Sequence, residues 1–170
     1  MGISALLLNA TIIDGAGGSP FVTDVAIVND RIAFIGDARD REAAERIDCT
    51  GKILAPGFID VHSHSDELWL ALPRCDGKIA QGVTTEIGGN CGTSVAPLYG
   101  SPALERAERH AQHIGIEIAW QSLDEFFSLV ERSGTALNVA TLAGLGTTRS
   151  AIGRTGGLGE SAWWPIDPFG

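Results

Sequence analysis

Hydrophobic and polar positions near the N-terminus alternate in the way that is typical of short β-strands. Apolar runs at residues 25–28 and 31–35 flank Asn29 and Asp30, and a glycine-rich run ends the alternation that precedes them. A two-residue connection of this kind between apolar runs indicates a β-hairpin. The pattern predicts a small antiparallel β unit over residues 1–52.

The next stretch, residues 53–66, is an apolar run that ends in two histidines separated by one residue. The Pro-Gly pair within it suits a junction better than a central strand, so we place a domain boundary near residue 53. We interpret the run as a buried strand. On a strand His62 and His64 would share one face with Cα atoms about 6.6 Å apart, close enough for both imidazoles to bind one metal ion. The alternative is two polar residues where the strand reaches solvent.

A second site-bearing strand is predicted at residues 83–87, which are rich in β-branched side chains and lead into Gly-Gly-Asn-Cys-Gly. The order strand, short helix at 78–82, strand predicts a parallel βαβ unit whose two strand ends open on the same side. Cys91 would then join the two histidines in a set of N and S ligands, which zinc prefers. The alternative for Cys91 is a buried thiol that fills the core.

The pattern from residue 102 onward predicts two helices and a third parallel strand. Residues 102–118 are rich in Ala and Glu, and Ser122 with Glu125 forms the signature of a capping box for a helix over 123–132. Residues 136–142 form the third candidate strand.

The composition argues against some classes of binding partner and favours a reducing cellular compartment. The 170 residues carry a net charge of −9 and have no cluster of Lys and Arg, which argues against nucleic acid or an anionic membrane as a partner. No apolar run is long enough to span a bilayer, and the N-terminus lacks the basic start of a signal peptide. Three cysteines without a close pair suit a reducing compartment. We therefore predict a cytoplasmic protein.

Four motifs together resemble a known family. They are APGFIDVHSHSD at 55–66, QGVTTE at 81–86, GNCG at 89–92 and APL at 96–98. These motifs resemble the D-aminoacylases (N-acyl-D-amino-acid deacylases) of the amidohydrolase superfamily, and the resemblance covers most of the chain up to about residue 150. The paired histidines alone would indicate only the superfamily, whereas the block with Cys91 is similar to the deacylase branch.

The resemblance implies an α/β fold in which a small β-sandwich lies beside a (β/α)8 barrel that holds zinc at its C-terminal mouth. Residues 1–52 would be part of the sandwich, and residues 53–150 the first βα units of the barrel. Residues 151–170 would form an irregular tail rich in Gly and Trp. Since such a barrel typically takes about 250 residues, the barrel in this sequence is incomplete.

The resemblance also implies the chemistry and the roles of the site residues. His62, His64 and Cys91 would bind one or two zinc ions, and Asp66 and Asn90 would support these ligands without touching the metal. The implied reaction is hydrolysis of a non-peptide amide that converts an N-acyl-D-amino acid into a carboxylate and a D-amino acid. The family's catalytic aspartate and two further histidine ligands are expected outside this sequence.

The sequence departs from the family pattern in its remaining histidines. His110 and His113, three residues apart on a predicted helix, fit a solvated helix face better than a metal site. Relatives commonly carry a histidine where this chain has Leu145.

Two other functions remain as alternatives. One is a truncated metal-binding protein without activity, and the other is a cyclic-amide hydrolase of the hydantoinase or dihydroorotase kind. The substrate side chain and the oligomeric state stay open.

Overall fold

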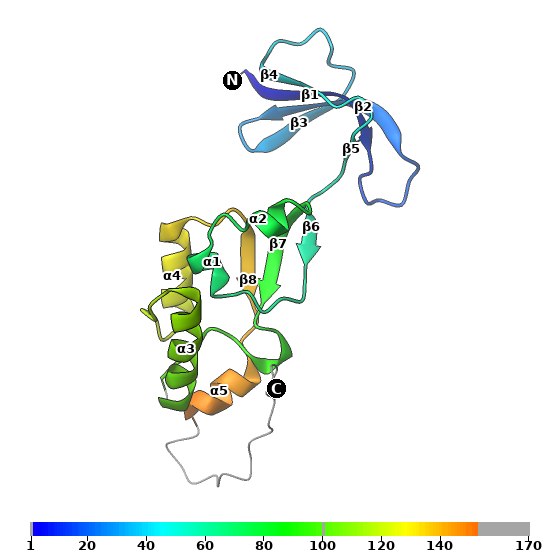
Figure 1. Ribbon diagram of the computed structural model, residues 1–170. Helices are drawn as coiled ribbons and strands as arrows, with labels where there is room; N and C mark the ends of the chain where they lie inside the picture. The colour runs from blue at the N-terminus through cyan, green and yellow to red at the C-terminus, as the bar shows by residue number, and fades with distance from the viewer. Residues whose placement is uncertain (1, 100, 153–170) are drawn as a thin grey trace. The chain divides into compact units, whose positions relative to one another are not determined.

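The computed structural model describes residues 2–99 and 101–152 and divides into two compact units between Pro56 and Gly57 (Figure 1). The predicted irregular tail at 151–170 lies, from position 153 onward, outside the described residues.

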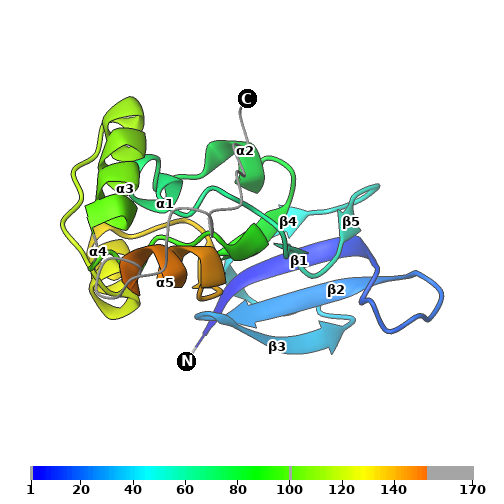
Figure 2. The same cartoon turned by 90° about the horizontal axis from the view of Figure 1, so that it is seen from below.

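The first unit is a mixed β-sheet. Its described strands are β1 (Ile3–Ile12), β2 (Phe21–Val28), β3 (Arg31–Gly36), β4 (Ala43–Asp48) and β5 (Ile53–Leu54). They lie in the order β3-β2-β1-β4, and β5 also pairs with β1 (Figure 2).

The predicted antiparallel arrangement is right for part of this sheet and wrong for the rest. The hairpin at Asn29 and Asp30 is confirmed, because β2 pairs antiparallel with both β1 and β3. β4 and β5, however, run parallel to β1. After β3 the chain passes to the other side of β1 before it forms β4. Because of this crossing, β4 runs parallel to β1, whereas the prediction was antiparallel. Alternation within each strand carries no information about such a crossing.

A buried carboxylate fastens the loops of the first unit to its sheet. Asp24 on β2 accepts hydrogen bonds from the backbone N–H of Asn9 and of Ala38, both at 2.9 Å. Asn9 lies in the left-handed region at φ 57°, where the register of β1 shifts against β2. Each N–H would otherwise lack an acceptor in that bulge or loop.

The second unit contains a parallel sheet in the order β6-β7-β8. Its described elements are β6 (Phe58–Asp60), α1 (Leu68–Ala71), α2 (Asp76–Ile79), β7 (Val83–Gly88), a 3-10 turn (Asn90–Gly92), α3 (Ser101–Ile114), α4 (Leu123–Ser133), β8 (Asn138–Thr141) and α5 (Leu145–Ile152). The predicted parallel βαβ unit and the third parallel strand are confirmed.

Helices α1, α3 and α4 pack on one face of this sheet around an aromatic core (Figure 1). The Phe126 ring lies 6.1 Å from Trp69 and 5.1 Å from Trp120 between centroids, in tilted and edge-to-face arrangements. The capping box of Ser122 and Glu125 is present at the start of α4. None of the helices in the described ranges is long and apolar enough to cross a membrane.

The apolar run before the histidines is not buried as predicted. Phe58 and Ile59 are both 61% exposed, and Val61 is also exposed. β6 is an edge strand of the described sheet and pairs there with β7 alone, so its side chains have neighbours on fewer sides than those of a central strand. The strand also ends at Asp60, two residues before the first histidine.

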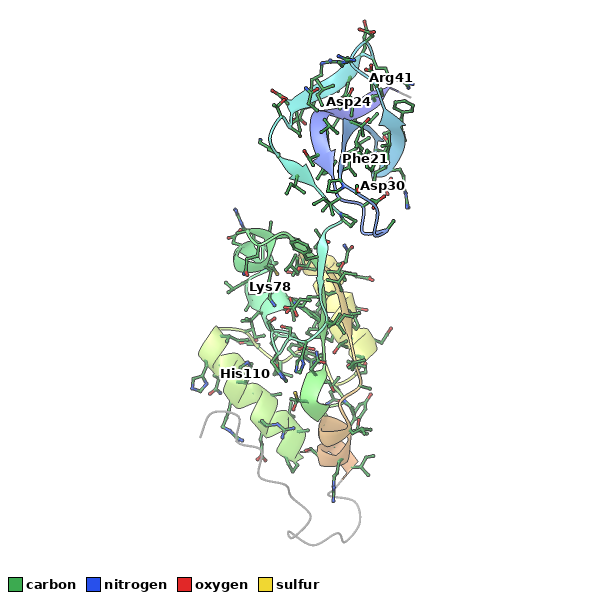
Figure 3. All side chains as sticks on the ribbon, turned by 90° about the vertical axis from the view of Figure 1, so that its right-hand side faces the viewer. Phe21, Asp24, Asp30, Arg41, Lys78 and His110 are labelled. Carbon is green, nitrogen blue, oxygen red and sulfur yellow. The ribbon has the colours of Figure 1, made fainter. Side chains whose placement is uncertain are left out.

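Replacing the buried carboxylate of the first unit tests its role. Asp24→Ala removes the acceptor of two backbone N–H groups, of which that of Ala38 is buried and that of Asn9 is partly buried. It should lower the free energy of unfolding by about 1–3 kcal/mol, the typical cost of one unsatisfied buried donor. Urea denaturation followed by circular dichroism measures the change. Asp30→Ala, at the exposed hairpin turn of the same sheet (Figure 3), is the matched control. Equal losses in both variants would contradict this role.

Candidate metal centre

The two predicted histidines follow the C-terminal end of β6 and lie side by side. Their ring centroids are 5.6 Å apart and the rings are tilted by 58°. Both side chains are exposed, whereas Ser63 between them is buried, so the histidines face away from the packed side of this segment. The Oδ1 atom of Asp60, the last residue of β6, accepts a hydrogen bond from the N–H of His62 at 3.2 Å.

Cys91 approaches the histidines from the end of the neighbouring strand. It lies in the 3-10 turn after β7 with φ 53° and ψ 27°, a left-handed conformation that is uncommon for residues other than glycine. Its Sγ atom lies 3.2 Å from Nε2 of His62. The predicted meeting of the two strand ends therefore brings these side chains into contact.

Together the three side chains form the one group of potential metal ligands found among the described residues. One donor atom from each of His62, His64 and Cys91 can be chosen so that all lie within 4.8 Å of one another. A tetrahedral zinc ion with bonds of about 2.0–2.3 Å holds its donors roughly 3.5 Å apart. Small side-chain rotations would therefore bring the set to chelating distance.

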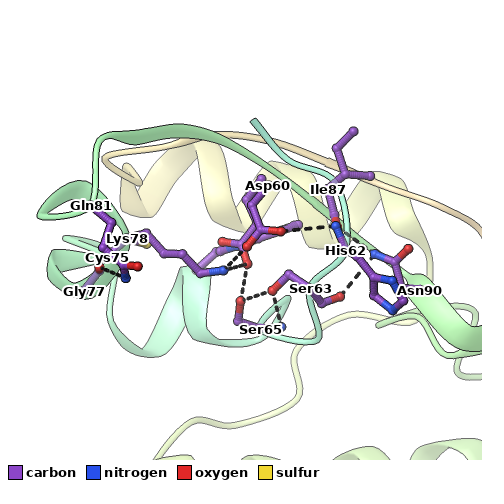
Figure 4. Close-up of polar contacts among 12 residues, drawn as sticks. Asp60, His62, Ser63, Ser65, Cys75, Gly77, Lys78, Gln81, Ile87 and Asn90 are labelled. Carbon is purple, nitrogen blue, oxygen red and sulfur yellow. Dashed lines mark hydrogen bonds and ion pairs between the residues drawn. The ribbon is translucent and has the colours of Figure 1, made fainter. Parts of the chain in front are cut away.

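The two residues predicted to support the ligands occupy different places. Asn90 donates from Nδ2 to the backbone oxygens of Ile87 at 2.8 Å and of Ser63 at 3.3 Å, which ties the Cys91 turn to the histidine segment (Figure 4). Asp66 is buried and accepts a hydrogen bond from Oγ1 of Thr141 on β8 at 2.9 Å. Burial raises the pKa of Asp66 above its ordinary value. Asp66 thus joins β8 to the histidine segment.

His110, His113 and Leu145 take no part in this group. His110 points outward from α3 (Figure 3), with Nε2 at 4.0 Å from a carboxylate oxygen of Glu67. The Nδ1 atom of His113 lies 2.6 Å from the backbone oxygen of Arg109 in the same helix. Leu145, at the start of α5, is 82% exposed. The solvated helix face is thus the better description of the two α3 histidines.

An ionic cluster around the buried carboxylate of Glu86, beneath the histidine segment, was missed by the sequence analysis. Lys78 on α2 forms an ion pair with Asp60 on β6 (Figure 4). It forms a second ion pair, at 3.3 Å, with Glu86 on β7. Glu86 also accepts hydrogen bonds from Ser65 and from Nε1 of Trp69 at 3.0 Å. The one sequence signal for this cluster was a glutamate inside an otherwise apolar and β-branched strand.

The charge states in this cluster follow from their partners. Burial favours the neutral form of Glu86, but hydrogen bonds from Ser63, Ser65 and Trp69, together with the charge of Lys78, hold its pKa below the ordinary value. The hydrogen bond from Lys78 is the main cause that lowers the pKa of Asp60. Both carboxylates are therefore charged at neutral pH, and Lys78 lies between them.

The sequence is similar to that of known amidohydrolases. Residues 45–125 match the amidohydrolase family. The D-aminoacylase of Alcaligenes xylosoxydans xylosoxydans is 37% identical over 147 residues, which cover 86% of this chain and 30% of that protein. The N-acyl-D-glutamate deacylase of the same organism is 38% identical over 145 residues, or 84% of this chain and 29% of that protein.

Solved structures of the same two kinds of deacylase are similar to this chain. A D-aminoacylase studied for its binuclear metal centre has a TM-score of 0.78 at 33% identity and covers 88% of this chain. The N-acyl-D-glutamate deacylase of Bordetella bronchiseptica, solved with zinc and a phosphonate inhibitor, has a TM-score of 0.77 at 34% identity and covers 91%. These matches confirm the predicted fold class, an incomplete barrel preceded by a small β unit. The chain spans about 30% of the length of its curated relatives.

The buried carboxylate of Glu86 predicts a specific pH dependence. Its pKa is lower in the folded protein than its ordinary value of 4.5, so its contribution to stability is full above about pH 4.5 and is lost as pH falls through the folded pKa. At pH 7 Glu86→Gln should lower the free energy of unfolding by about 3 kcal/mol, the typical cost of breaking a buried ion pair. The difference from the unmodified protein should shrink at lower pH.

Urea denaturation at a series of pH values between 3 and 7 measures this profile. Glu45→Gln, at an exposed position of β4 in the first unit, is the matched control and should leave the profile unchanged. A loss of stability in Glu86→Gln that stays constant down to pH 3 would contradict a role for the charge.

Proposed function

The chain belongs to the amidohydrolase family, and from this premise we propose that the protein is a zinc-dependent hydrolase of non-peptide amide bonds. The observation that carries the proposal is the convergence of His62, His64 and Cys91, whose donor atoms lie within 4.8 Å of one another at the ends of two parallel strands. The proposed substrates are N-acyl-D-amino acids, and the products are a carboxylate and a free D-amino acid.

The chemistry of the donor set supports zinc as the metal. Imidazole nitrogen and thiolate sulfur are both good ligands for this borderline-soft ion, and three protein ligands leave a position open for water or substrate. A zinc ion bound there would polarise the acyl carbonyl and lower the pKa of a bound water to about 7. The proposal is for one or two zinc ions at this site.

The chain's own residues hold and orient the donors. Asp60 fixes the backbone of His62 at the end of β6, and Asn90 joins the backbone on either side of the Cys91 turn to the histidine segment. Because all three ligand side chains are exposed, an acyl group can reach them from solvent. The residue that moves the proton during hydrolysis is expected to be an aspartate of the last barrel strand, and this stays a prediction.

The similarity to two kinds of deacylase supports the substrate class. The curated relatives include a D-aminoacylase and an N-acyl-D-glutamate deacylase at nearly equal identity. We therefore propose the shared chemistry, an acyl group on the amine of a D-amino acid, and leave the side chain open. A cytoplasmic location also stays a prediction.

A substrate panel tests the reaction. The full-length protein, loaded with zinc, should release amino acids from N-acetyl-D-amino acids at least about 100-fold faster than from the L enantiomers or from the ring of hydantoin. Amine release measured by a fluorogenic reagent, and ring opening measured by ultraviolet absorbance, give the comparison. Activity on the ring alone would favour the cyclic-amide hydrolase, and inactivity on every substrate would favour the metal-binding protein without activity.

Substitution of the ligands tests the site. His62→Ala and Cys91→Ala should each lower hydrolysis by more than about 100-fold, the upper end of what the loss of a supporting contact costs, and should release zinc on dialysis. Zinc content is measured by atomic emission beside the rate. His113→Ala on the exposed face of α3 is the matched control. Unchanged zinc content and rate in either ligand variant would refute the assignment.

A further inference from the structure

The segment that carries the histidines has two sides with different partners. Residues 62–65 read His-Ser-His-Ser. The two histidines are exposed, whereas Ser63 is only 8% exposed and Ser65 is half-buried. The serine hydroxyls therefore lie on the packed side of the segment while the imidazoles lie on the open side.

The two serine hydroxyls and the carboxylate of Glu86 form one hydrogen-bonded group. The Ser65 hydroxyl donates to Oε1 of Glu86, which is a carboxylate and can only accept. The hydroxyl oxygens of Ser63 and Ser65 lie 2.6 Å apart, so Ser63 belongs to the same hydrogen-bonded group. The Ser63 oxygen in turn accepts from the N–H of Ser65 at 3.3 Å. Both serines are thus fixed in rotation by one carboxylate.

Glu86 is itself held from several directions. It is 1% exposed, its Oε2 accepts from Nε1 of Trp69 at 3.0 Å, and Nζ of Lys78 lies 3.3 Å from its Oε1. A carboxylate that accepts from an indole N–H and a hydroxyl and faces an ammonium group has little freedom to move. It is therefore a rigid point to which a loop can be anchored.

Strand β7 joins this anchor to the third ligand. Glu86 lies on β7, and Cys91 follows it by five residues in the turn at the end of the same strand. Asn90 beside Cys91 makes a second attachment, to the backbone oxygen of Ser63. The histidine segment is therefore fastened to the Cys91 strand at two points, one on each side of Ile87 and Gly88.

We propose that Glu86 is a positioning residue that sets the distance between the histidine pair and Cys91 through the hydroxyls of Ser65 and Ser63. The inference rests on the proposed function, since it concerns the metal affinity of the site proposed there. Glu86 touches none of the three ligands. It acts on the backbone that carries two of them, and its effect is to preorganise the donor set before the metal arrives.

Zinc affinity measured without substrate tests the anchor. Ser65→Ala removes the hydroxyl that links Glu86 to the histidine segment but leaves the bonds of Glu86 to Trp69 and Lys78 in place, so the fold is retained. In the full-length protein, Ser65→Ala and Glu86→Gln should each weaken Zn²⁺ binding about 10–100-fold, as is typical for residues that orient metal ligands. Competition with a chromophoric chelator gives the affinity.

A cobalt spectrum provides a second readout that general stability would not move. With Co²⁺ in place of Zn²⁺, the charge-transfer band of the Cys91 thiolate should weaken in Ser65→Ala and Glu86→Gln, because the histidines no longer hold the ion at the sulfur. Ser122→Ala is the matched control, since it removes a serine hydroxyl that caps α4 and does not contact the site. It should leave both affinity and spectrum unchanged.

Three outcomes would overturn the proposal. Wild-type Zn²⁺ affinity and an unchanged cobalt band in Ser65→Ala and Glu86→Gln would mean that the cluster only joins helices to the sheet. An equal loss of affinity in Ser122→Ala would mean that stability in general is responsible. Unchanged metal binding in His62→Ala and Cys91→Ala would refute the metal site itself, and the anchor with it. The ligand variants thus distinguish failure of the site from failure of the anchor.

Discussion

The parallel pairing of β6 with β7 is the constraint on which the candidate site depends. In this register Asp60 lies opposite Glu86, so both strands end at the same edge of the sheet. Two segments 29 residues apart thereby bring Nε2 of His62 to 3.2 Å from Sγ of Cys91. Because strand side chains alternate, a slip of one residue would move Glu86 to the opposite face of the sheet. The register thus fixes both the ligands and their support.

The sequence was sufficient for the elements and for the meeting of the ligands, because both follow from local patterns. β-branched residues predicted β7, Ser122 with Glu125 predicted the start of α4, and a strand-helix-strand order implies parallel strands that end together. It was insufficient for the direction of β4 and for the exposure of Phe58. Those depend on which strands become neighbours, and periodicity within one segment says nothing about its neighbours.

The sequence also could not predict the ionic cluster, because its members come from segments whose proximity no local pattern shows. Lys78 reads as an ordinary exposed residue of a short helix, and Asp60 and Glu86 lie on two different strands. Their meeting is visible only once α2 is placed beside the start of β7 (Figure 1). Burial of Glu86 would then be costly without partners. The partners it has, Ser65 and Trp69 among them, are contributed by the segment that begins with the histidines.

The Cys91 turn is held by close packing of one backbone segment against another, whereas the histidine segment is held by contacts to the charged Glu86. A Cβ atom on Gly89 would lie 2.1 Å from the oxygen of Leu142, and one on Gly144 would lie 2.6 Å from the oxygen of Gly92. Glycine at these two positions thus allows the loop before α5 to pack against this turn.

Hydrogen bonds then lock the two backbones together. Thr147 accepts from the N–H of Ser94 at 2.9 Å and donates to its oxygen at 3.1 Å, and the hydroxyl of Ser94 accepts from the N–H of Gly144 at 2.9 Å. The histidines are therefore positioned through the charge of Glu86, and the Cys91 turn is positioned by close backbone contact and by these hydrogen bonds. Acid weakens the support of the histidines by protonating Glu86, whereas it leaves the backbone contacts of the Cys91 turn in place.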